Sequence, residues 1–332
     1  MKVLVTGPDG LLGSNLVREL ISRDYEVCAF VEKNKNLKTI SCLDLKLIQG
    51  DILEKDDVMS ATNNIDIIIH CAAMTNMYPP RICKVNRVNI DGTKNVVSAA
   101  LKNNVKRLIH VGTANSFKSG DIDKPGNELN DYGASHYGLD YMDSKYKAQQ
   151  FVLDKVKNDG LDAVIVNPTF MIGPFDSRPS SGEMIRGVCN KKIPGYPLGG
   201  KNYVSVKDVS VAIVNAISKG ETGNCYILGN ENLTYKDAFE KIASCTNSTP
   251  PKFKLTKSLI RFYGKVNSVL SKIFNLNPKI TYELAILSSE FHYYSSEKAI
   301  KFLDLPQTPI EDAINQCYDW FIQNNYLTEK RD

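Results

Sequence analysis

The chain has 332 residues, of which 42% are hydrophobic and 23% are charged, and 41 Lys and Arg against 37 Asp and Glu give a formal charge of +4. This composition indicates a globular protein and excludes disordered, collagen-like and coiled-coil chains. A charge of +4 is too small to indicate nucleic-acid binding, which depends on clustered Lys and Arg. No segment approaches the roughly 18 uncharged apolar residues of a membrane span.

The N-terminus lacks the features of a signal peptide, because a strand pattern and a glycine turn follow Met1-Lys2 directly. The eight cysteines form no Cys-x-x-Cys pair and have no zinc spacing with the four histidines. We therefore expect a cytoplasmic protein with reduced, mostly buried thiols and no metal site.

Short apolar segments alternate with segments of helical periodicity through residues 1–175. The expected strands are Lys2–Thr6, Tyr25–Val31, Leu45–Gln49, Ile65–Cys71, Arg107–Val111 and Ala163–Asn167. The expected helices are Leu11–Arg23, Lys55–Ala61, Val85–Asn103 and Tyr137–Asp159. This alternation predicts an α/β protein with a Rossmann-type, doubly wound parallel sheet and helices on both faces.

The pattern changes after Pro168, where turn-rich segments separate shorter elements. We expect the nucleotide-binding domain to comprise 1–175 with a returning segment at about 202–229. The remainder, 176–201 and 230–332, is expected to form a smaller and mainly helical substrate lobe.

The first strand is followed by a glycine turn of the form G-x-x-G-x-x-G, made by Gly7, Gly10 and Gly13. Glycine permits a tight turn and a close approach of the backbone to a pyrophosphate. The helix that begins at Leu11 and Leu12 offers free N–H groups and the positive end of its dipole. The turn therefore predicts a dinucleotide-binding site, whereas a plain strand–helix turn is the less favoured interpretation.

Glu32 ends the second strand about 20 residues after the turn, where an acidic side chain bonds the ribose 2′-hydroxyl of NAD. Lys33 and Lys35 follow and could instead bind the 2′-phosphate of NADP. The pattern thus predicts NAD(P), with NAD favoured over NADP. A solvated strand end without a ligand is the alternative for Glu32.

Several motifs occur in the order typical of one family. They are the glycine turn, Gly50-Asp51-Ile52, His70-Cys71-Ala72-Ala73, Val88–Val96 and Tyr141-Met142-Asp143-Ser144-Lys145. The chain resembles the extended short-chain dehydrogenase/reductases, also described as NAD-dependent epimerases/dehydratases. Asn167–Pro174 is most similar to the branch of the dihydroflavonol reductases and 3β-hydroxysteroid dehydrogenases.

The resemblance implies further cofactor-binding residues. These are Asp51 and Ile52 beside the adenine, Ala72 and Ala73 at the pyrophosphate and ribose, and Pro168 and Thr169 beside the nicotinamide. It also implies that Asn89 holds the geometry of the active-site helix, and that the protein is a homodimer joined through Val85–Asn103 and Tyr137–Asp159.

Tyr-x-x-x-Lys occurs four times in this chain, so context must select the functional pair. The pairs are Tyr141/Lys145, Tyr203/Lys207, Tyr294/Lys298 and Tyr326/Lys330. Only Tyr141 and Lys145 lie on an expected helix of the nucleotide domain, where i and i+4 share one face. We expect Tyr141 to transfer a proton, because an adjacent lysine and the nicotinamide ring lower the pKa of the phenol.

The resemblance implies that Lys145 also binds the nicotinamide ribose and that Thr113 polarises the substrate oxygen. Ser116 is the alternative to Thr113. Ala114 and Asn115 stand where related dehydratases carry Asp-Glu, which makes dehydration improbable. Asn167 and Phe170 replace residues by which epimerases hold sugar nucleotides.

We therefore expect an NAD(P)-dependent oxidoreductase that catalyses reversible ketone/alcohol hydride transfer on a small, rather apolar substrate. A nucleotide-sugar epimerase is the first alternative. A non-catalytic cofactor-bound sensor or scaffold is the second, although it would not need Thr113, Tyr141 and Lys145.

A basic amphipathic helix is expected at Lys254–Phe274. Cationic residues of this region are Lys252, Lys254, Lys257, Arg261, Lys265, Lys272 and Lys279, and apolar ones are Leu259, Ile260, Phe262, Val266, Leu270 and Phe274. Such a helix can bind an anionic membrane. We expect instead that its apolar face is buried in the lobe and that its lysines are exposed, so that membrane contact is unlikely.

Overall fold

A computed structural model describes residues 1–274 and 281–328, without the side chains of 272–274. Its centre is a seven-stranded sheet, and every neighbouring pair of strands is parallel. The strand order is β10 (Cys225–Leu228), β6 (Ala163–Pro168), β5 (Arg107–Val111), β4 (Ile67–His70), β1 (Lys2–Thr6), β2 (Glu26–Val31) and β3 (Lys46–Gln49). The predicted doubly wound sheet is confirmed.

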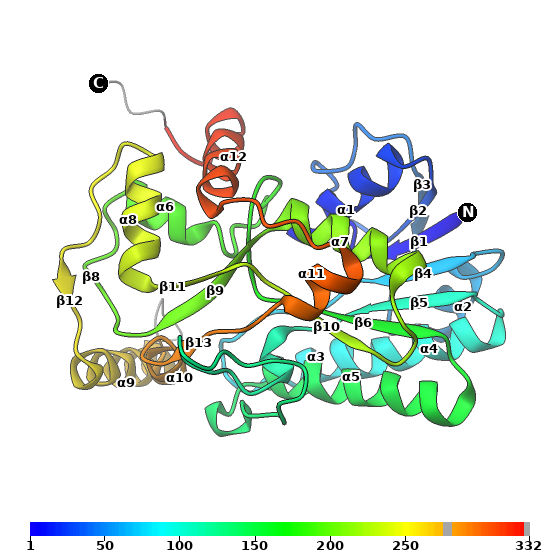
Figure 1. Ribbon diagram of the computed structural model, residues 1–332, viewed down its shortest axis with the longest axis horizontal. Coiled ribbons are helices and arrows are strands. Elements are labelled where there is room, and N and C mark those ends of the chain that lie inside the picture. The colour runs from blue at the N-terminus through cyan, green and yellow to red at the C-terminus, as the bar shows by residue number, and fades with distance from the viewer. Residues whose placement is uncertain (275–280, 329–332) are drawn as a thin grey trace.

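Helices cover both faces of this sheet (Figure 1). One face packs against α1 (Leu11–Ser22), α7 (Val206–Lys219) and α11 (Glu297–Leu303), and the other against α2 (Lys55–Ala61), α4 (Gly92–Lys102) and α5 (Asp140–Asp159). The strand Ile67–His70 shows why the central strands are apolar throughout. Ile67 and Ile69 enter the first core and Ile68 the second, so neither face meets water.

The expected helix Val85–Asn103 is interrupted. It consists of α3 (Cys83–Asn86), a π-helical turn at Arg87–Asp91 and α4. π-helical turns are frequent at functional sites, and this one contains the buried Asn89. The next expected helix begins at Asp140 rather than Tyr137, because Gly138 adopts a left-handed conformation with φ of 64°.

A second sheet organises the lobe. It contains β9 (Gly200–Ser205), which pairs with β7 (Phe170–Ile172), β11 (Glu231–Thr234) and β13 (Phe291–His292). A separate two-stranded sheet pairs β8 (Gly195–Tyr196) with β12 (Phe253–Lys254). The helices of the lobe are α6 (Glu183–Cys189), α8 (Tyr235–Cys245), α9 (Lys257–Phe274), α10 (Tyr282–Leu287) and α12 (Ile310–Gln323).

The chain passes between these two parts more than once. Within segment 202–229, β9 belongs to the sheet of the lobe, whereas α7 and β10 pack in the nucleotide-binding part. Ala299, Leu303 and Leu305 also enter the core beneath α1 and α7. The segment around α11 therefore returns to the nucleotide-binding sheet, although its place in the sequence lies within the expected lobe.

The structure corrects the expected burial of α9. Ile260 is buried, but Leu259, Phe262, Val266 and Leu270 are exposed. The prediction was wrong because the face of α9 that packs on the protein contains Ile260, Gly264 and Ser271, whereas most of the large apolar side chains lie on the outer face. The side chains of Lys272 and Phe274, and the whole of Lys279, lie outside the described residues.

The cysteines also differ from expectation. All eight are free, but only Cys28 and Cys317 are buried, whereas Cys42 and Cys83 are exposed. Among the described residues, none of the helices combines the length and apolar character needed to cross a bilayer.

Candidate active site

The expected site residues gather at one edge of the large sheet. Because parallel strands end at the same edge, the residues that follow them meet there. These residues are Gly7 after β1, Glu32 after β2, Asp51 and Ile52 after β3, Ala72 and Ala73 after β4, Thr113 after β5, and Pro168 and Thr169 at the end of β6.

The glycine turn has the conformation that a dinucleotide requires. Gly7 has a φ of 67°, and a Cβ at this residue would lie 2.9 Å from the Cα atom of Ala72. A Cβ at Gly13 would lie 2.1 Å from the carbonyl oxygen of Gly7, so α1 packs directly on the turn. No side chain caps α1 at Gly10, which leaves the N-terminal N–H groups of this helix for an anion. The turn therefore fits a pyrophosphate.

Buried hydrogen bonds position the chain after β4. Nδ1 of His70 lies 2.8 Å from the hydroxyl of Thr6, and Nε2 lies 3.0 Å from that of Thr93. The backbone N–H of Ala72 donates to the same Thr6 hydroxyl at 3.1 Å. Burial lowers the pKa of His70 to about 3, so the ring is neutral at physiological pH. The sequence alone did not indicate this role for His70.

Glu32 is exposed at the end of β2, and its carboxylate pairs with the ammonium of Lys35 at 2.9 Å. The hydrogen bond from Lys35 lowers the pKa of Glu32. The two residues that favour different cofactors are thus direct partners. The Asp51 carboxylate is held within its own loop, because its Oδ1 accepts a hydrogen bond from the backbone N–H of Leu53.

Lys145 is buried, and its ammonium donates a 2.5 Å hydrogen bond to the carbonyl oxygen of Val111, at the end of β5. Burial lowers the pKa of Lys145 to about 8. Burial also raises the pKa of Tyr141, while a hydrogen bond with the Thr113 hydroxyl opposes this effect. The predicted lowering of the Tyr141 pKa required Lys145 together with a nicotinamide ring; in the chain alone, Lys145 bonds the end of β5 and desolvation of the phenol dominates.

Thr113 begins a 3-10 turn over Ala114–Ser116, and its hydroxyl accepts from the N–H of Asn115 at 3.4 Å. Ser116, the alternative to Thr113, is only 1% exposed. Its hydroxyl is therefore closed off from a substrate, whereas Thr113 is the partner of Tyr141.

Two buried amide side chains, those of Asn167 and Gln149, connect β6 with the segment after β5 and with α5. Nδ2 of Asn167 donates to the carbonyl oxygen of Thr113 at 3.0 Å and to Oε1 of Gln149, on α5, at 2.7 Å. A Cβ at Gly112 would lie 2.5 Å from that same Nδ2. Sequence reasoning missed this positioning role of Asn167. A polar residue within the apolar strand Ala163–Pro168 was the available signal.

Asn89 also bonds α5, at a different point from Asn167. Its Nδ2 donates to the Ser144 hydroxyl at 2.9 Å, and its Oδ1 accepts from the N–H of Met74 at 2.8 Å. These contacts connect α5 to the segment that follows β4.

The other Tyr-x-x-x-Lys pairs lie elsewhere. Tyr203 is buried in β9, where its hydroxyl approaches the sulfur of Met184 at 3.9 Å, and Lys207 is on α7. Tyr294 is buried and donates to the carbonyl oxygen of Phe117 at 3.2 Å. Tyr326 donates to the carbonyl oxygen of Ser177, and Lys330 lies outside the described residues.

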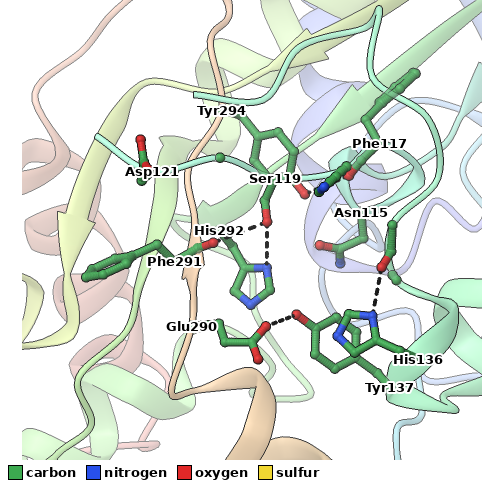
Figure 2. A pocket seen from close by; sticks show the side chains of 14 residues that line it. Asn115, Phe117, Ser119, Asp121, His136, Tyr137, Glu290, Phe291, His292 and Tyr294 are labelled. Carbon is green, nitrogen blue, oxygen red and sulfur yellow. Dashed lines mark hydrogen bonds between the residues drawn. The ribbon is translucent and has the colours of Figure 1, made fainter. Parts of the chain in front are cut away.

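A cavity of about 380 Å³ lies beside Asn115 and Tyr137, and both polar and aromatic side chains line it (Figure 2). The Tyr137 hydroxyl donates to the carboxylate of Glu290, and the Ser119 hydroxyl donates to the carbonyl oxygen of Phe291 at 3.1 Å. Burial lowers the pKa of His292 to about 4, so this histidine is neutral at pH 7.

A second cavity, of about 480 Å³, is mainly apolar and lies between α8, α9 and α10. Leu284 and Leu287 of α10 line it, and both also pack in the hydrophobic cluster that contains Tyr141. The same two side chains therefore lie between this cavity and the surroundings of Tyr141.

Comparison with known proteins decides the family. Residues 3–229 match the model of the NAD dependent epimerase/dehydratase family. The chain belongs to this family. Its members are NAD-dependent dehydrogenases, dehydratases and epimerases, so the resemblance noted in the sequence is confirmed and the chain is assigned NAD(P)-dependent chemistry of this kind.

Individual members of the family match over nearly the whole chain. A putative dihydroflavonol 4-reductase of Synechocystis sp. is 28% identical, with 97% of this chain and 95% of the relative covered. Sterol demethylase protein B of Methylococcus capsulatus is 26% identical, with 98% and 100% covered. The crystal structure of gox2253 is similar with a TM-score of 0.87 and 30% identity, over 98% of this chain and 99% of that one.

The glycine turn allows a paired test. We expect Gly13→Ala to reduce both thermal stability and cofactor affinity, because its Cβ would overlap the Gly7 carbonyl. Gly10→Ala should keep the melting temperature, since its nearest neighbour would lie 3.7 Å away, but should weaken cofactor binding by filling the space for the pyrophosphate. Thermal melts and NADH titrations measure the two effects. Equal destabilisation by both substitutions would contradict the different roles assigned to Gly10 and Gly13.

The pKa of Lys145 predicts an unusual pH dependence of stability. Because the folded-state pKa is about 8 instead of 10.5, the folded state binds fewer protons than the unfolded state between these values. Burying the ammonium thus costs stability below pH 8, and that cost falls as the pH rises towards 10.5. We expect Lys145→Met to increase the free energy of unfolding at pH 7, by up to about 3 kcal/mol, while weakening cofactor binding.

The stability advantage of Lys145→Met should shrink between pH 8 and pH 10, as urea titrations at each pH would show. Lys147→Met, at an exposed position on the same helix, is the control and should show no such trend. A variant less stable than the native protein at pH 7 would refute the stated cost of burying Lys145.

Proposed function

We propose that this protein is an oxidoreductase that catalyses reversible ketone/alcohol hydride transfer on a small, rather apolar substrate. The observation that carries the proposal is the grouping of Thr113, Tyr141 and Lys145 where β5 ends against α5. A sensor or scaffold needs no such grouping of a proton donor, its hydroxyl partner and a buried ammonium.

Each of the three side chains has a distinct part in this reaction. The Tyr141 phenol gives its proton to the substrate oxygen during reduction and takes it back during oxidation. The Thr113 hydroxyl donates a hydrogen bond to the same oxygen. NAD(P) supplies or accepts the hydride at the substrate carbon when it is bound, and Lys145 holds its ribose.

The raised pKa of Tyr141 suits this role. A neutral phenol is the form that protonates a carbonyl oxygen, so the chain without cofactor is ready for reduction. Oxidation requires the phenolate, which a positively charged nicotinamide ring favours.

Dehydration has less support, because it needs an additional acid and base beside Thr113. Ala114 and Asn115 occupy these positions, and Ala114 is only 2% exposed. Support for an apolar substrate comes from the apolar cavity at Leu284 and Leu287, and from relatives whose names refer to a dihydroflavonol and to sterols.

Epimerisation of a sugar nucleotide is the second candidate, and one observation favours it. The cavity beside Asn115 presents the side chains of Ser119, His136 and Glu290, which can bond sugar hydroxyls (Figure 2). The same catalytic tyrosine serves both reactions, so only the substrate distinguishes them.

We expect the protein to bind NADH at least as tightly as NADPH. The supporting argument is that the carboxylate of Glu32 stands where the 2′-phosphate would lie, and that Lys35 is already paired with it. Fluorescence titration with both reduced cofactors measures this preference. Glu32→Ala should shift it towards NADPH, whereas a clear preference of the native protein for NADPH would contradict the expectation.

Tyr141→Phe should lower turnover by about 10²–10⁴, with little change in melting temperature or cofactor affinity, because the ring remains and only the transferred proton is lost. Activity is measured with a panel of ketones, aldehydes, alcohols and sugar nucleotides. Turnover of ketones supports the proposed function, and activity with sugar nucleotides alone supports the epimerase.

Tyr203→Phe is the matched control for Tyr141→Phe. It has the same spacing to a lysine and is also buried, but its hydroxyl has only a weak contact with sulfur. Near-native activity of Tyr141→Phe, combined with loss in Tyr203→Phe, would refute the assignment. Cofactor binding without turnover of any compound would favour the sensor or scaffold.

A further inference from the structure

Helix α9 has a buried inner face and an exposed apolar stripe on its outer face. The inner face contains Ile260, Gly264 and Ser271, all of which are buried. A Cβ at Gly264 would lie 2.7 Å from the carbonyl oxygen of Thr281, so this face packs closely against the start of α10. The outer stripe follows the i, i+3, i+4 spacing of one helix face. It consists of Leu259, Phe262, Tyr263, Val266, Val269 and Leu270.

The outer stripe is exposed along its whole length. Phe262 is 68% exposed, and Phe253, shortly before α9, is 74% exposed. Single apolar residues on a surface are common, but a continuous stripe of large ones marks an interaction site. In Figure 1, α9 lies at the end of the lobe, away from α4 and α5.

The charges around this stripe are all of one sign. Lys252, Lys254, Lys257 and Lys265 are exposed, and the segment 252–279 contains no Asp or Glu. Within the part of the chain that the structure describes, none of these four lysines forms an ion pair. Their charge is thus available to an anionic partner.

The charge pattern disfavours a second copy of this chain as the partner. A two-fold symmetric interface presents the same patch from both subunits, so lysines would face lysines without carboxylates to pair them. A basic helix with one apolar face instead matches the surface of a bilayer, where the apolar side chains enter the acyl region and the lysines meet anionic headgroups.

The apolar cavity reaches the surface at this same stripe. Leu259 and Tyr263 are both about half exposed, and both line the cavity. Its opposite side is formed by Leu284 and Leu287, which pack in the cluster that contains Tyr141. Leu284 and Leu287 therefore form an apolar wall that this cavity shares with the surroundings of Tyr141.

We propose that the outer face of α9 docks on an anionic lipid membrane and that the apolar cavity takes its substrate, a lipid-soluble alcohol or ketone, from the bilayer. The first part stands on α9 alone, whereas the second rests on the proposed oxidoreductase function. The inference replaces the expectation that membrane contact is unlikely, because that expectation assumed a buried apolar face.

The test measures flotation of the full-length protein with phosphatidylcholine–phosphatidylserine vesicles and with phosphatidylcholine vesicles. We expect binding to the anionic vesicles only, and a decrease in binding as NaCl rises. The variant Phe262→Asp/Lys265→Glu changes one apolar anchor and one charge, and neither residue lines the cavity. It should reduce vesicle partitioning at least about tenfold.

A matched control is available on α11, where Lys301 and Phe302 are also exposed. Phe302→Asp/Lys301→Glu makes the same chemical change elsewhere and should float like the native protein. The docking proposal is overturned if the native protein does not float with anionic vesicles, if it floats equally with neutral ones, or if both variants lose binding equally. It is also overturned if the α9 variant converts a vesicle-free dimer to a monomer, which would show that the face joins two copies.

Activity on a short, water-soluble ketone without vesicles separates this proposal from the proposed function. The α9 variant should retain native turnover in that assay and should lose at least about tenfold in turnover of a long-chain ketone carried in anionic vesicles. Ketone turnover without flotation would refute docking and leave the function standing. Flotation without turnover of any ketone or alcohol would refute the function and leave docking standing.

Discussion

The amide of Asn167 connects the parts on which the candidate site depends. It joins the carbonyl of Thr113, at the end of β5, to Gln149 on α5, and thus fixes the helix of Tyr141 and Lys145 against the sheet edge. The contact requires Gly112, because any Cβ there would meet the amide nitrogen. The buried Nδ2 group of Asn167 would cost free energy if it lost its hydrogen bonds. A shift of α5 would break the bond to Gln149, so this bond favours one position of the helix.

Lys145 and Tyr141 show how burial shifts the pKa of a group that is cationic when charged and of a group that is anionic when charged. Lowering the pKa of Lys145 to about 8 and raising that of Tyr141 both favour the neutral form, since desolvation disfavours any charge. The chain by itself therefore holds a proton on Tyr141. A positively charged cofactor ring shifts the balance towards the phenolate, which links the direction of proton transfer to the redox state of the bound NAD(P).

Two cavities give this fold two ways of recognising a substrate. The cavity beside Asn115 has a mixed lining that includes Ser119, His136 and Glu290, whereas the cavity beside α9 is mainly apolar. Residues of the lobe line the apolar cavity, and a loop after β5 joins the lobe in lining the other, while Tyr141 and Lys145 lie on α5 and Thr113 follows β5. This division explains how members of one family share a proton-transfer site and differ in their reactions.

The sequence by itself determined the parallel sheet and the glycine turn, and it singled out Tyr141 and Lys145 among four equivalent spacings as the only pair on a helix of the nucleotide-binding part. These features follow from local patterns, namely apolar periodicity, glycine geometry and the i, i+4 spacing of a helix. Only the tertiary structure decided that Asn167 and His70 position the site, because their partners lie far away in the chain. It also decided which face of α9 meets the protein, since Ile260 and Phe262 are both apolar and only packing against α10 shows that the first is buried and the second exposed.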